Sequence, residues 1–210
     1  MPQNNKVPTP TLERLATYFA IITDLKIKRV DTISSADVEE RTGVNAAQFR
    51  KDLSYFGEFG RPGIGYKVDE LHARIGRILK LEKTQPVVLM GAGNLGSALA
   101  GYPALRAENF QIVAAFDNNN NKIGNQLWDL TIRNAEALVE DNKTLQARIA
   151  IIAVPAGAAQ EVAERLVEAG IRNILNFAPV VLRLPSDVIV RNVDFVQELA
   201  VLSFHLSQDT

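Results

Sequence analysis

The sequence predicts a two-domain protein in which a small helical domain precedes an α/β domain with a parallel doubly wound sheet. Before residue 84, apolar residues recur at helical spacing, whereas later short Val- and Ile-rich runs alternate with helical stretches. Strands that are buried on both faces and alternate with helices are typical of a parallel sheet. Because the composition changes over residues 80–86, the domain boundary is expected there.

The composition indicates a globular cytoplasmic protein. The chain has 210 residues, of which 47% are hydrophobic, and it contains no cysteine. Without cysteine there are no disulfides and no thiolate catalysis, and a reducing compartment is favoured. No run of about 18 apolar residues predicts a membrane span, and the first residues lack the apolar segment of a signal peptide.

Charge is distributed unevenly between the two halves of the chain. Residues 1–84 carry 14 Lys and Arg against 11 Asp and Glu, a net charge of +3, whereas residues 85–210 carry 9 against 13, a net charge of −4. This asymmetry permits contact between the N-terminal part and a polyanion.

The first helix of the N-terminal domain, residues 1–84, is expected to begin near Pro10. Proline suits the first helical position, where its missing N–H would have no partner anyway, and Thr9 is the expected cap. Apolar residues at helical spacing predict one buried stripe that consists of Leu12, Leu15, Phe19 and Ile22.

Two shorter helices follow, separated by a Thr-Gly-Val turn. Ser34 and Asp37 form a capping-box-like pair at the start of the first, which ends at Gly43. Asn45 caps the second, with Gln48 reaching back, and its inward face is expected to hold Phe49, Leu53 and Phe56. Such a pair is a helix-turn-helix, whose second helix presents its outer face to a ligand. That face carries Gln48, Arg50, Lys51, Ser54 and Tyr55.

Residues 56–68, FGEFGRPGIGYKV, predict a β-hairpin with its tip at Arg61-Pro62-Gly63. A fourth helix is expected from Asp69, and its buried residues are Leu71, Ile75, Ile78 and Leu79. A hairpin beside a helix-turn-helix is a wing. The N-terminal domain is therefore predicted to be a winged-helix domain.

This architecture favours contact with double-stranded DNA. A solvated charged face is the ordinary interpretation of isolated Arg and Lys residues, but here they lie on a recognition helix and a wing. Arg and Lys set position on phosphates, helix side chains reach base edges in the major groove, and Arg61 at the wing tip can enter a minor groove. The expected DNA-binding residues are Gln48, Arg50, Lys51, Ser54, Tyr55, Arg61 and Lys67.

The second domain, residues 85–192, shows the alternation of a Rossmann-like fold. Its strands are expected at 87–90, 111–116, 148–154, 173–176 and 188–193, and its helices at 95–105 and 158–169.

A glycine-rich turn follows the first of these strands and opens the next helix. Its G-x-G-x-x-G pattern consists of Gly91, Ala92, Gly93, Asn94, Leu95 and Gly96. The glycines allow a tight turn, close approach to a pyrophosphate and helix–strand packing. Asp117, 21 residues past Gly96, suits the adenosine ribose hydroxyls and repels a 2′-phosphate, which favours NAD(H) over NADP(H). The alternative is a turn that serves packing alone.

The sequence offers few proton donors for hydride-transfer chemistry. After residue 83 the candidates are Tyr102, Lys122, Lys143 and His205, with no Tyr-x-x-x-Lys pair and no metal-ligand spacing. No catalytic residue and no metal site are therefore assigned. Two alternatives stay open: an NAD-dependent dehydrogenase or reductase with a regulatory N-terminal domain, and a ligand-gated interaction module that does not bind DNA.

The C-terminal segment, residues 193–210, predicts a helix from Asp194 that is apolar almost all round, and its apolar positions are 195, 196, 199, 200, 201, 202, 204 and 206. Such a helix must be buried by something, and a second subunit is the expected partner. A homodimer also suits a palindromic operator, whose half-sites match two-fold symmetry.

Segments along the whole chain resemble one family, namely RKDLSYFGEFG, GIGY, GAGNLGSALAGYP, FD, VP, ILNFAP and NVDFVQELAVLSF. The family is Rex, the redox-sensing transcriptional repressors. The resemblance implies a dimer that binds operators through winged-helix domains and releases them when NADH rises against NAD⁺. NAD(H) is then sensed and not consumed.

The resemblance also implies roles for individual residues. The glycine-rich turn would hold the pyrophosphate and Asp117 the ribose, while Arg50 and Lys51 would contact DNA. Tyr102 would lie near the nicotinamide and exchange hydrogen bonds with the partner subunit's Asp194, beside an inserted Phe195. The residues expected to line the rest of that pocket are Val154, Pro155, Asn176, Phe177, Ala178 and Pro179.

The chain departs from the family pattern at two positions. Ala20 stands where members carry an Arg that pairs with the acid matching Asp194, and Arg14 is another candidate for that ion pair. Pro62 stands where members carry the wing Arg, and Arg61 lies one place earlier.

Overall fold

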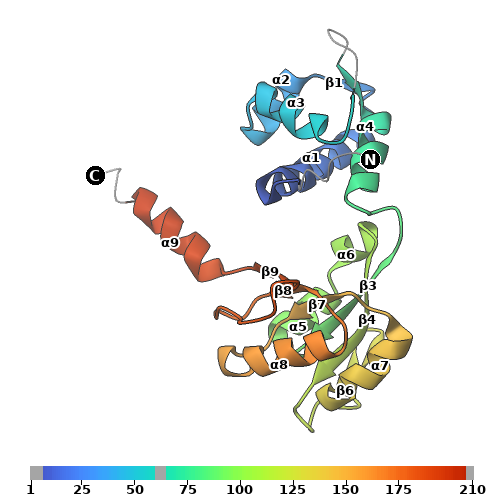
Figure 1. Cartoon of the computed structure of the whole chain (residues 1–210), viewed down its shortest axis with the longest axis vertical. Coiled ribbons are helices and arrows are strands. Elements are labelled where there is room, and N and C mark those ends of the chain that lie inside the picture. Colours follow the sequence, from blue (N-terminus) through green and yellow to red (C-terminus); the bar gives the residue numbers. More distant parts are fainter. Residues whose placement is uncertain (1–6, 60–64, 207–210) are drawn as a thin grey trace. The chain divides into compact units, whose positions relative to one another are not determined.

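The computed structural model describes residues 7–59 and 65–206. The chain divides into two compact units, an N-terminal unit, Met1–Lys83, and a C-terminal unit, Thr84–Thr210 (Figure 1). The division falls within residues 80–86, where the composition of the sequence changes.

The N-terminal unit is built from helices with one short two-stranded sheet (Figure 1). Its elements are α1 (Thr9–Ile27), β1 (Thr32–Ile33), α2 (Ser35–Thr42), α3 (Ala46–Ser54), β2 (Tyr66–Lys67) and α4 (Val68–Ile78). The helices enclose one core whose largest fully buried side chains are Tyr18, Phe49, Leu15, Ile22, Leu53 and Ile75. The helix-turn-helix formed by α2 and α3 is thus fixed by packing against α1 and α4.

The caps of α2 and α3 are largely as predicted. Ser34 and Asp37 make both hydrogen bonds of a capping box, and Gly43 ends α2 in the left-handed region. Asn45 caps α3 by accepting from the Ala47 N–H at 2.7 Å. Gln48 does not reach back to Asn45, because its amide donates to the buried Asp52 instead.

The start of α1 differs from the prediction. Its N-cap is Pro8, so Thr9 lies inside the helix and does not cap it. Leu12 is 40% exposed and does not join the buried stripe. The inward position one residue earlier belongs to Thr11, which is buried because its hydroxyl donates to Asp52.

The predicted hairpin over residues 56–68 is only partly correct. Residues 57–59 are not in a strand, and β2 pairs antiparallel with β1, Ile33 opposite Tyr66. A two-residue strand leaves no alternation to detect, which is why β1 was not predicted. The predicted tip, Arg61-Pro62-Gly63, lies outside the described residues.

The C-terminal unit contains a seven-stranded sheet of order β5-β6-β4-β3-β7-β8-β9. The strands are β3 (Gln85–Met90), β4 (Phe110–Asp117), β5 (Gln126–Leu127), β6 (Leu130–Asn134), β7 (Ile149–Ile152), β8 (Asn173–Asn176) and β9 (Ile189–Asn192). Every pairing is parallel except that of β5 with β6. The Rossmann-like doubly wound fold is confirmed, with one antiparallel edge.

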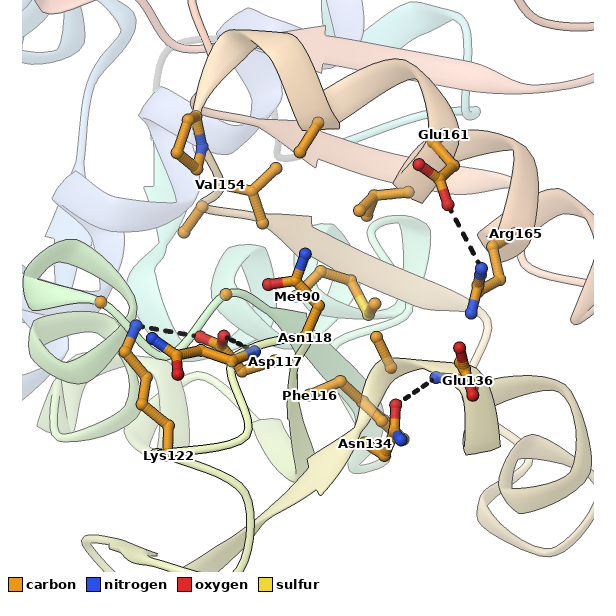
Figure 2. A pocket seen from close by; sticks show the side chains of 18 of the residues that line it. Met90, Phe116, Asp117, Asn118, Lys122, Asn134, Glu136, Val154, Glu161 and Arg165 are labelled. Carbon is orange, nitrogen blue, oxygen red and sulfur yellow. Dashed lines mark hydrogen bonds and ion pairs between the residues drawn. The ribbon is translucent and has the colours of Figure 1, made fainter.

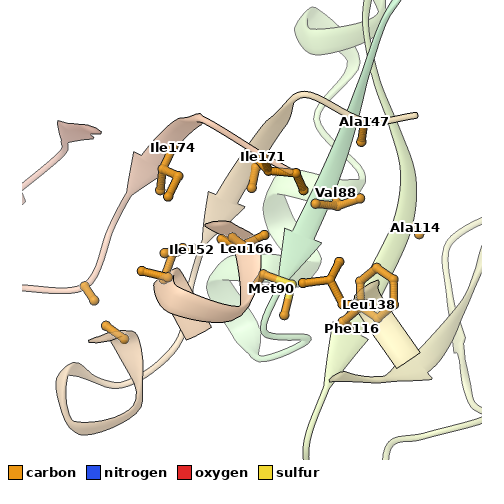
Figure 3. Close-up of a cluster of buried hydrophobic side chains, with 14 residues drawn as sticks. Val88, Met90, Ala114, Phe116, Leu138, Ala147, Ile152, Leu166, Ile171 and Ile174 are labelled. Carbon is orange, nitrogen blue, oxygen red and sulfur yellow. The ribbon is translucent and has the colours of Figure 1, made fainter. Parts of the chain in front are cut away.

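Alternate residues of the central strand β3 face two separate cores. Val88 and Met90 belong to the core drawn in Figure 3, under α7 (Leu138–Leu145) and α8 (Ala156–Glu168). Val87 and Leu89 face the other side, where α5 (Asn94–Ala100) packs. This burial on both faces explains the continuous apolar run of β3.

The helix predicted over 95–105 is two helices, α5 and α6 (Pro103–Ala107). Pro103 disfavours helical geometry at the residue before it, and Tyr102 accordingly has an extended backbone. Between β4 and β7 the sequence reasoning assigned no elements, although β5, β6, a 3₁₀ turn (Ala135–Ala137) and α7 form there.

The last helix, α9 (Phe195–Leu206), follows β9 as predicted and starts from Asp194, whose side chain accepts from the Val196 N–H at 2.9 Å. Its apolar side chains are not covered by the rest of the chain. Those that are more than half exposed are Phe195, Val196, Leu199, Val201, Leu202, Phe204 and Leu206.

Candidate functional site

A cleft of about 850 Å³ opens at the carboxyl edge of the central strands (Figure 2). It is lined by the turn after β3, the end of β4, the 3₁₀ turn after β6 and the start of α8. The carboxyl edge is where doubly wound sheets bind ligands, and the volume lies within the range of small-molecule pockets.

The glycine-rich turn forms the floor of this cleft, and three glycines play different parts. Gly91 has φ +101°, and an added Cβ would lie 2.5 Å from the Ala153 carbonyl oxygen. At Gly96 an added Cβ would overlap the Gly91 carbonyl oxygen. Gly93 instead faces open space, so that a ligand can approach its backbone. The tight turn at Gly91 and the close packing at Gly96 are present, and the approach of a pyrophosphate at Gly93 stays a prediction.

Asp117 ends β4 at the edge of the cleft and is 8% exposed. Its carboxylate accepts from the Ala92 N–H at 2.9 Å, the Asn119 N–H at 2.8 Å and Lys122 Nζ at 3.1 Å. Burial acts to raise the pKa of Asp117, but these hydrogen bonds outweigh it and lower the pKa below its ordinary value. The carboxylate is therefore ionised at neutral pH and tied to the glycine-rich turn through Ala92.

The opposite side of the cleft carries polar residues that the sequence reasoning missed. Arg165 pairs with Glu161 at 3.3 Å on α8, and in Figure 2 the Arg165 side chain points toward Glu136 across the cleft. Asn134 accepts from the Glu136 N–H at 2.9 Å. No sequence pattern marked these residues, because Asn134 and Glu136 lie at the end of an unpredicted strand and just after it, and Glu161 and Arg165 lie within a predicted helix.

Seven of the predicted cofactor residues line the cleft, namely Gly91, Gly93, Asn94, Leu95, Asp117, Val154 and Pro155. Ala92 and Gly96 do not line it: the Ala92 N–H donates to Asp117, and Gly96 lies against the Gly91 carbonyl. Tyr102 does not face it: the side chain is 56% exposed and lines a separate cavity of about 300 Å³ with Trp128 and Arg106. The break between α5 and α6 places Tyr102 at the helix end remote from the glycine-rich turn.

The residues predicted around the end of the sheet also lie apart from the cleft within one chain. Asn176 is buried, and its amide nitrogen donates to the carbonyl oxygens of Ala178 and Val180 and to Asn192 Oδ1. Phe177 lies 6.1 Å from Phe195 between ring centroids, and Asp194 caps α9. These contacts lie at the end of β9 and at the start of α9.

The outer face of α3 presents two exposed cations, Arg50 and Lys51. Arg50 Nη1 donates to Ser35 Oγ at 2.8 Å, which holds the guanidinium over α2. The Ser54 hydroxyl donates to the Lys51 carbonyl at 2.7 Å, and Tyr55 is 40% exposed. On β2, Lys67 pairs with Glu70 at 3.0 Å. The predicted Arg61 lies outside the described residues.

Asp52, which the sequence reasoning passed over, is fully buried beneath this face. It accepts from Arg14 Nε at 2.6 Å and Nη2 at 2.7 Å, from the Tyr18 hydroxyl at 2.9 Å and from Gln48 Nε2 at 2.8 Å. Burial acts to raise the pKa of Asp52, but these donors lower it overall. Gln48 is thus engaged inward, and Arg14 ties α1 to α3.

Two curated relatives cover almost the full length of the chain. The redox-sensing transcriptional repressor Rex of Carboxydothermus hydrogenoformans is 47% identical over 204 residues, which are 97% of this chain and 98% of the relative. The Rex of Chloroflexus aurantiacus is 45% identical over 100% of this chain and 99% of its own.

The chain belongs to the Rex family.

Solved structures agree with this assignment. The Rex-family repressor RSP in complex with β-NAD⁺ and operator DNA has a TM-score of 0.91 and 36% identity, covering 98% of this chain and 95% of its own. RSP in complex with β-NADH has a TM-score of 0.88 and 34% identity, over 98% and 97%. Two family models also match parts of the chain: a putative DNA-binding protein N-terminus matches residues 6–54, and a CoA-binding domain matches residues 82–180.

Of the two positions that depart from the Rex pattern, the structure describes Ala20 but not Pro62. Ala20 lies exposed on α1. Arg14, the other candidate for the ion pair with Asp194, is bonded to Asp52 in the N-terminal unit. Pro62 lies outside the described residues.

Over the described ranges, no helix is long and apolar enough to cross a membrane, and no group of His, Asp or Glu is arranged to hold a metal ion.

Proposed function

We propose that the protein is a cytoplasmic transcriptional repressor that binds operator DNA and releases it when NADH binds. The observation that carries the proposal is the combination, in one Rex-family chain, of a helix-turn-helix with two exposed cations and a dinucleotide cleft. The domains are a winged helix (1–84), a Rossmann-like domain (85–192) and a dimerisation helix (193–210).

NAD(H) fits the residues that the cleft provides. The open space at Gly93 admits the pyrophosphate, and Asn94 and Leu95 begin a helix whose N-cap carries no side chain to satisfy its first N–H groups. The ionised Asp117 suits ribose hydroxyls. The same carboxylate disfavours a phosphate on that ribose, as in NADP(H) or coenzyme A, even with Lys122 beside it.

The proposed active form is a homodimer joined through α9. A mostly exposed helix with seven large apolar side chains is stable only when another surface covers them. In such a dimer Asp194 and Phe195 belong to the helix of one protomer. We propose that they act with Tyr102, Asn176 and Phe177 near the nicotinamide of a neighbouring site.

Sensing without turnover is the proposed use of the dinucleotide. When bound, the cofactor supplies a nicotinamide ring that differs by one unit of charge between NAD⁺ and NADH. Lys122 is paired with Asp117 and His205 is exposed on α9, and Tyr102 is proposed to respond to the ring charge and not to transfer a proton. The ring charge must change the relative stability of two dimer arrangements, because equal affinity for both would shift nothing.

A band-shift titration on duplexes selected for binding tests the proposal. We expect binding to a palindromic site with NAD⁺ or without cofactor, and release with NADH. NADH absorbance over hours, with small carbonyl compounds added, is expected to stay constant. Steady NADH oxidation would favour the dehydrogenase alternative, and binding to no duplex would favour an interaction module.

A further inference from the structure

Trp128, the only tryptophan of the chain, occupies an unusual backbone position. It lies with Asp129 in the two-residue turn between β5 and β6, where Leu127 pairs with Leu130. Its φ is +58°, in the left-handed region that Gly, Asn and Asp adopt far more readily than a bulky side chain. A tryptophan here is retained against backbone strain, so contacts elsewhere must hold it.

Those contacts are made with the end of α5. The indole Nε1–H donates to the Ser97 carbonyl at 2.9 Å. The ring lies against Gly101, where an added Cβ would overlap the indole. Gly101 itself has φ −88°, which any residue adopts, so only the indole requires glycine there.

The other residue of the turn is bonded to the next helix. Asp129 pairs with Arg106 of α6 at 2.6 Å. One turn therefore holds α5 through Trp128 and α6 through Asp129, on both sides of the break that carries Tyr102. Gly101 and Tyr102 join these two short helices, and the Tyr102 backbone bonds both: its N–H donates to the Leu99 carbonyl at 3.1 Å, and its carbonyl accepts from the Leu105 N–H at 3.3 Å. The turn adds two side-chain contacts to this backbone link.

α5 also leads directly back to the dinucleotide cleft. The Ser97 N–H donates to the Gly93 carbonyl at 2.8 Å, while its carbonyl receives Trp128. Ser97 thus joins the glycine-rich turn to the indole within one helical turn of α5.

We propose that the Trp128-Asp129 turn is a positioning element that braces α5 against α6 and fixes the backbone of Tyr102. Its consequence is a redox response that depends on Trp128 although Trp128 does not line the cleft. The inference rests on the proposed function, since it takes Tyr102 as a residue that distinguishes NADH from NAD⁺.

Three variants of the full chain test the brace: Trp128→Asn, Gly101→Ala and the two combined. Asparagine tolerates the left-handed backbone, so Trp128→Asn removes the brace while relieving the strain of the turn. Gln126→Ala is the matched control, because it removes an exposed hydrogen bond to Thr131 in the same hairpin and leaves the indole in place. Thermal unfolding, NAD⁺ affinity and the NADH concentration that releases half of the operator are measured for each.

We expect Trp128→Asn to unfold near the wild-type temperature and to bind NAD⁺ within about twofold of wild type, while the NADH concentration for release rises fivefold or more, as loss of a typical coupling would give. Gly101→Ala should have the same effect alone and no further effect in the double variant, since its added methyl group has no indole to displace there. Gln126→Ala should respond as wild type does.

Trp128 emission gives a readout of the brace that does not depend on DNA. Trp128 is 66% exposed in the wild type, so the expected readout in Gly101→Ala is a further increase in acrylamide quenching as the indole is displaced from α5. If either single variant fails to fold, Trp128→Phe, which keeps a ring but no N–H, replaces it and should give an intermediate response.

Two failures are distinguishable. A wild-type chain that ignores NADH overturns the proposed function, and with it the role of Trp128 in the redox response. A responsive wild type with an equally responsive Trp128→Asn overturns the brace alone. The brace is also overturned if the effects of Trp128→Asn and Gly101→Ala on the NADH concentration for release multiply in the double variant.

Discussion

Asp117 shows how far a single residue can be predicted from sequence. Its spacing from the glycine-rich turn and its place at a strand end predicted a carboxylate at the ribose, and the structure puts it at the edge of the cleft. Its bond to the Ala92 N–H could not be predicted, because it depends on the turn between β3 and α5.

Asp117→Asn is expected to weaken NADH binding and to narrow the preference over NADPH. Hydrogen bonds to a charged group are worth about 1.5–3 kcal/mol, or roughly 10- to 150-fold in affinity. Calorimetric titration with both dinucleotides measures the two affinities. Asp187→Asn, at an exposed ion pair with Arg172 in the same unit, is the control. An unchanged NADH:NADPH ratio would exclude Asp117 from ribose recognition.

Asp52 is the residue that the sequence reasoning missed. It lies between two predicted DNA-binding residues and a predicted core leucine, and helical spacing alone does not show that a carboxylate at this position is buried. The Asp52 carboxylate can be buried because Arg14 and Tyr18 of α1 and Gln48 of α3 donate hydrogen bonds to it.

Asp52→Asn should destabilise the N-terminal unit by about 3–5 kcal/mol at neutral pH, because Arg14 loses its buried partner. The pKa of Asp52 is lowered on folding, so its contribution is present above the ordinary carboxyl pKa and is lost as pH falls through the folded-state value. The difference between variant and wild type should therefore shrink below about pH 4. Thermal unfolding across pH measures it, with the exposed Asp24→Asn as control.

At the scale of elements, strongly patterned segments were predicted well and weakly patterned ones were not. β8 matches its predicted range, and the α2 capping box is present as expected. β5 and β6 were missed because β5 has only two residues and the alternation of β6 covers only Leu130 to Arg133, too few residues for a clear pattern. One helix was predicted in place of α5 and α6 because apolar spacing continues through the break that Pro103 imposes.

The recognition helix α3 yields a prediction about salt dependence. Arg50→Ala with Lys51→Ala should weaken binding to all duplexes and reduce the slope of log affinity against log salt by about 2, one for each phosphate that is no longer neutralised. Fluorescence anisotropy at several salt concentrations gives the slope. Lys28→Ala, an exposed cation at the end of α1, is the control. An unchanged slope would remove these two side chains from the DNA interface.

At the scale of the whole molecule, α9 is the feature that one chain cannot explain. Its composition predicted an uncovered helix, and the structure leaves its apolar side chains exposed. Neither the sequence nor the structure shows which surface covers them, and a second copy of the chain is the proposed partner.

Leu199→Asp with Leu202→Asp is expected to convert the proposed dimer into a monomer, because two carboxylates would have to be desolvated in the interface. Sedimentation equilibrium measures the mass. Val181→Asp, at a position 81% exposed outside α9, should leave the mass unchanged. A double variant that still sediments as a dimer would place the interface elsewhere.

The central claim is that the redox state of the dinucleotide controls operator binding. It is tested most directly by the operator dissociation constant at fixed salt, measured once with saturating NADH and once with saturating NAD⁺. A coupling of about 1–3 kcal/mol predicts operator binding roughly 5- to 150-fold weaker with NADH, and reciprocity requires the operator to disfavour NADH relative to NAD⁺ by the same factor. Equal dissociation constants with the two dinucleotides would contradict the account.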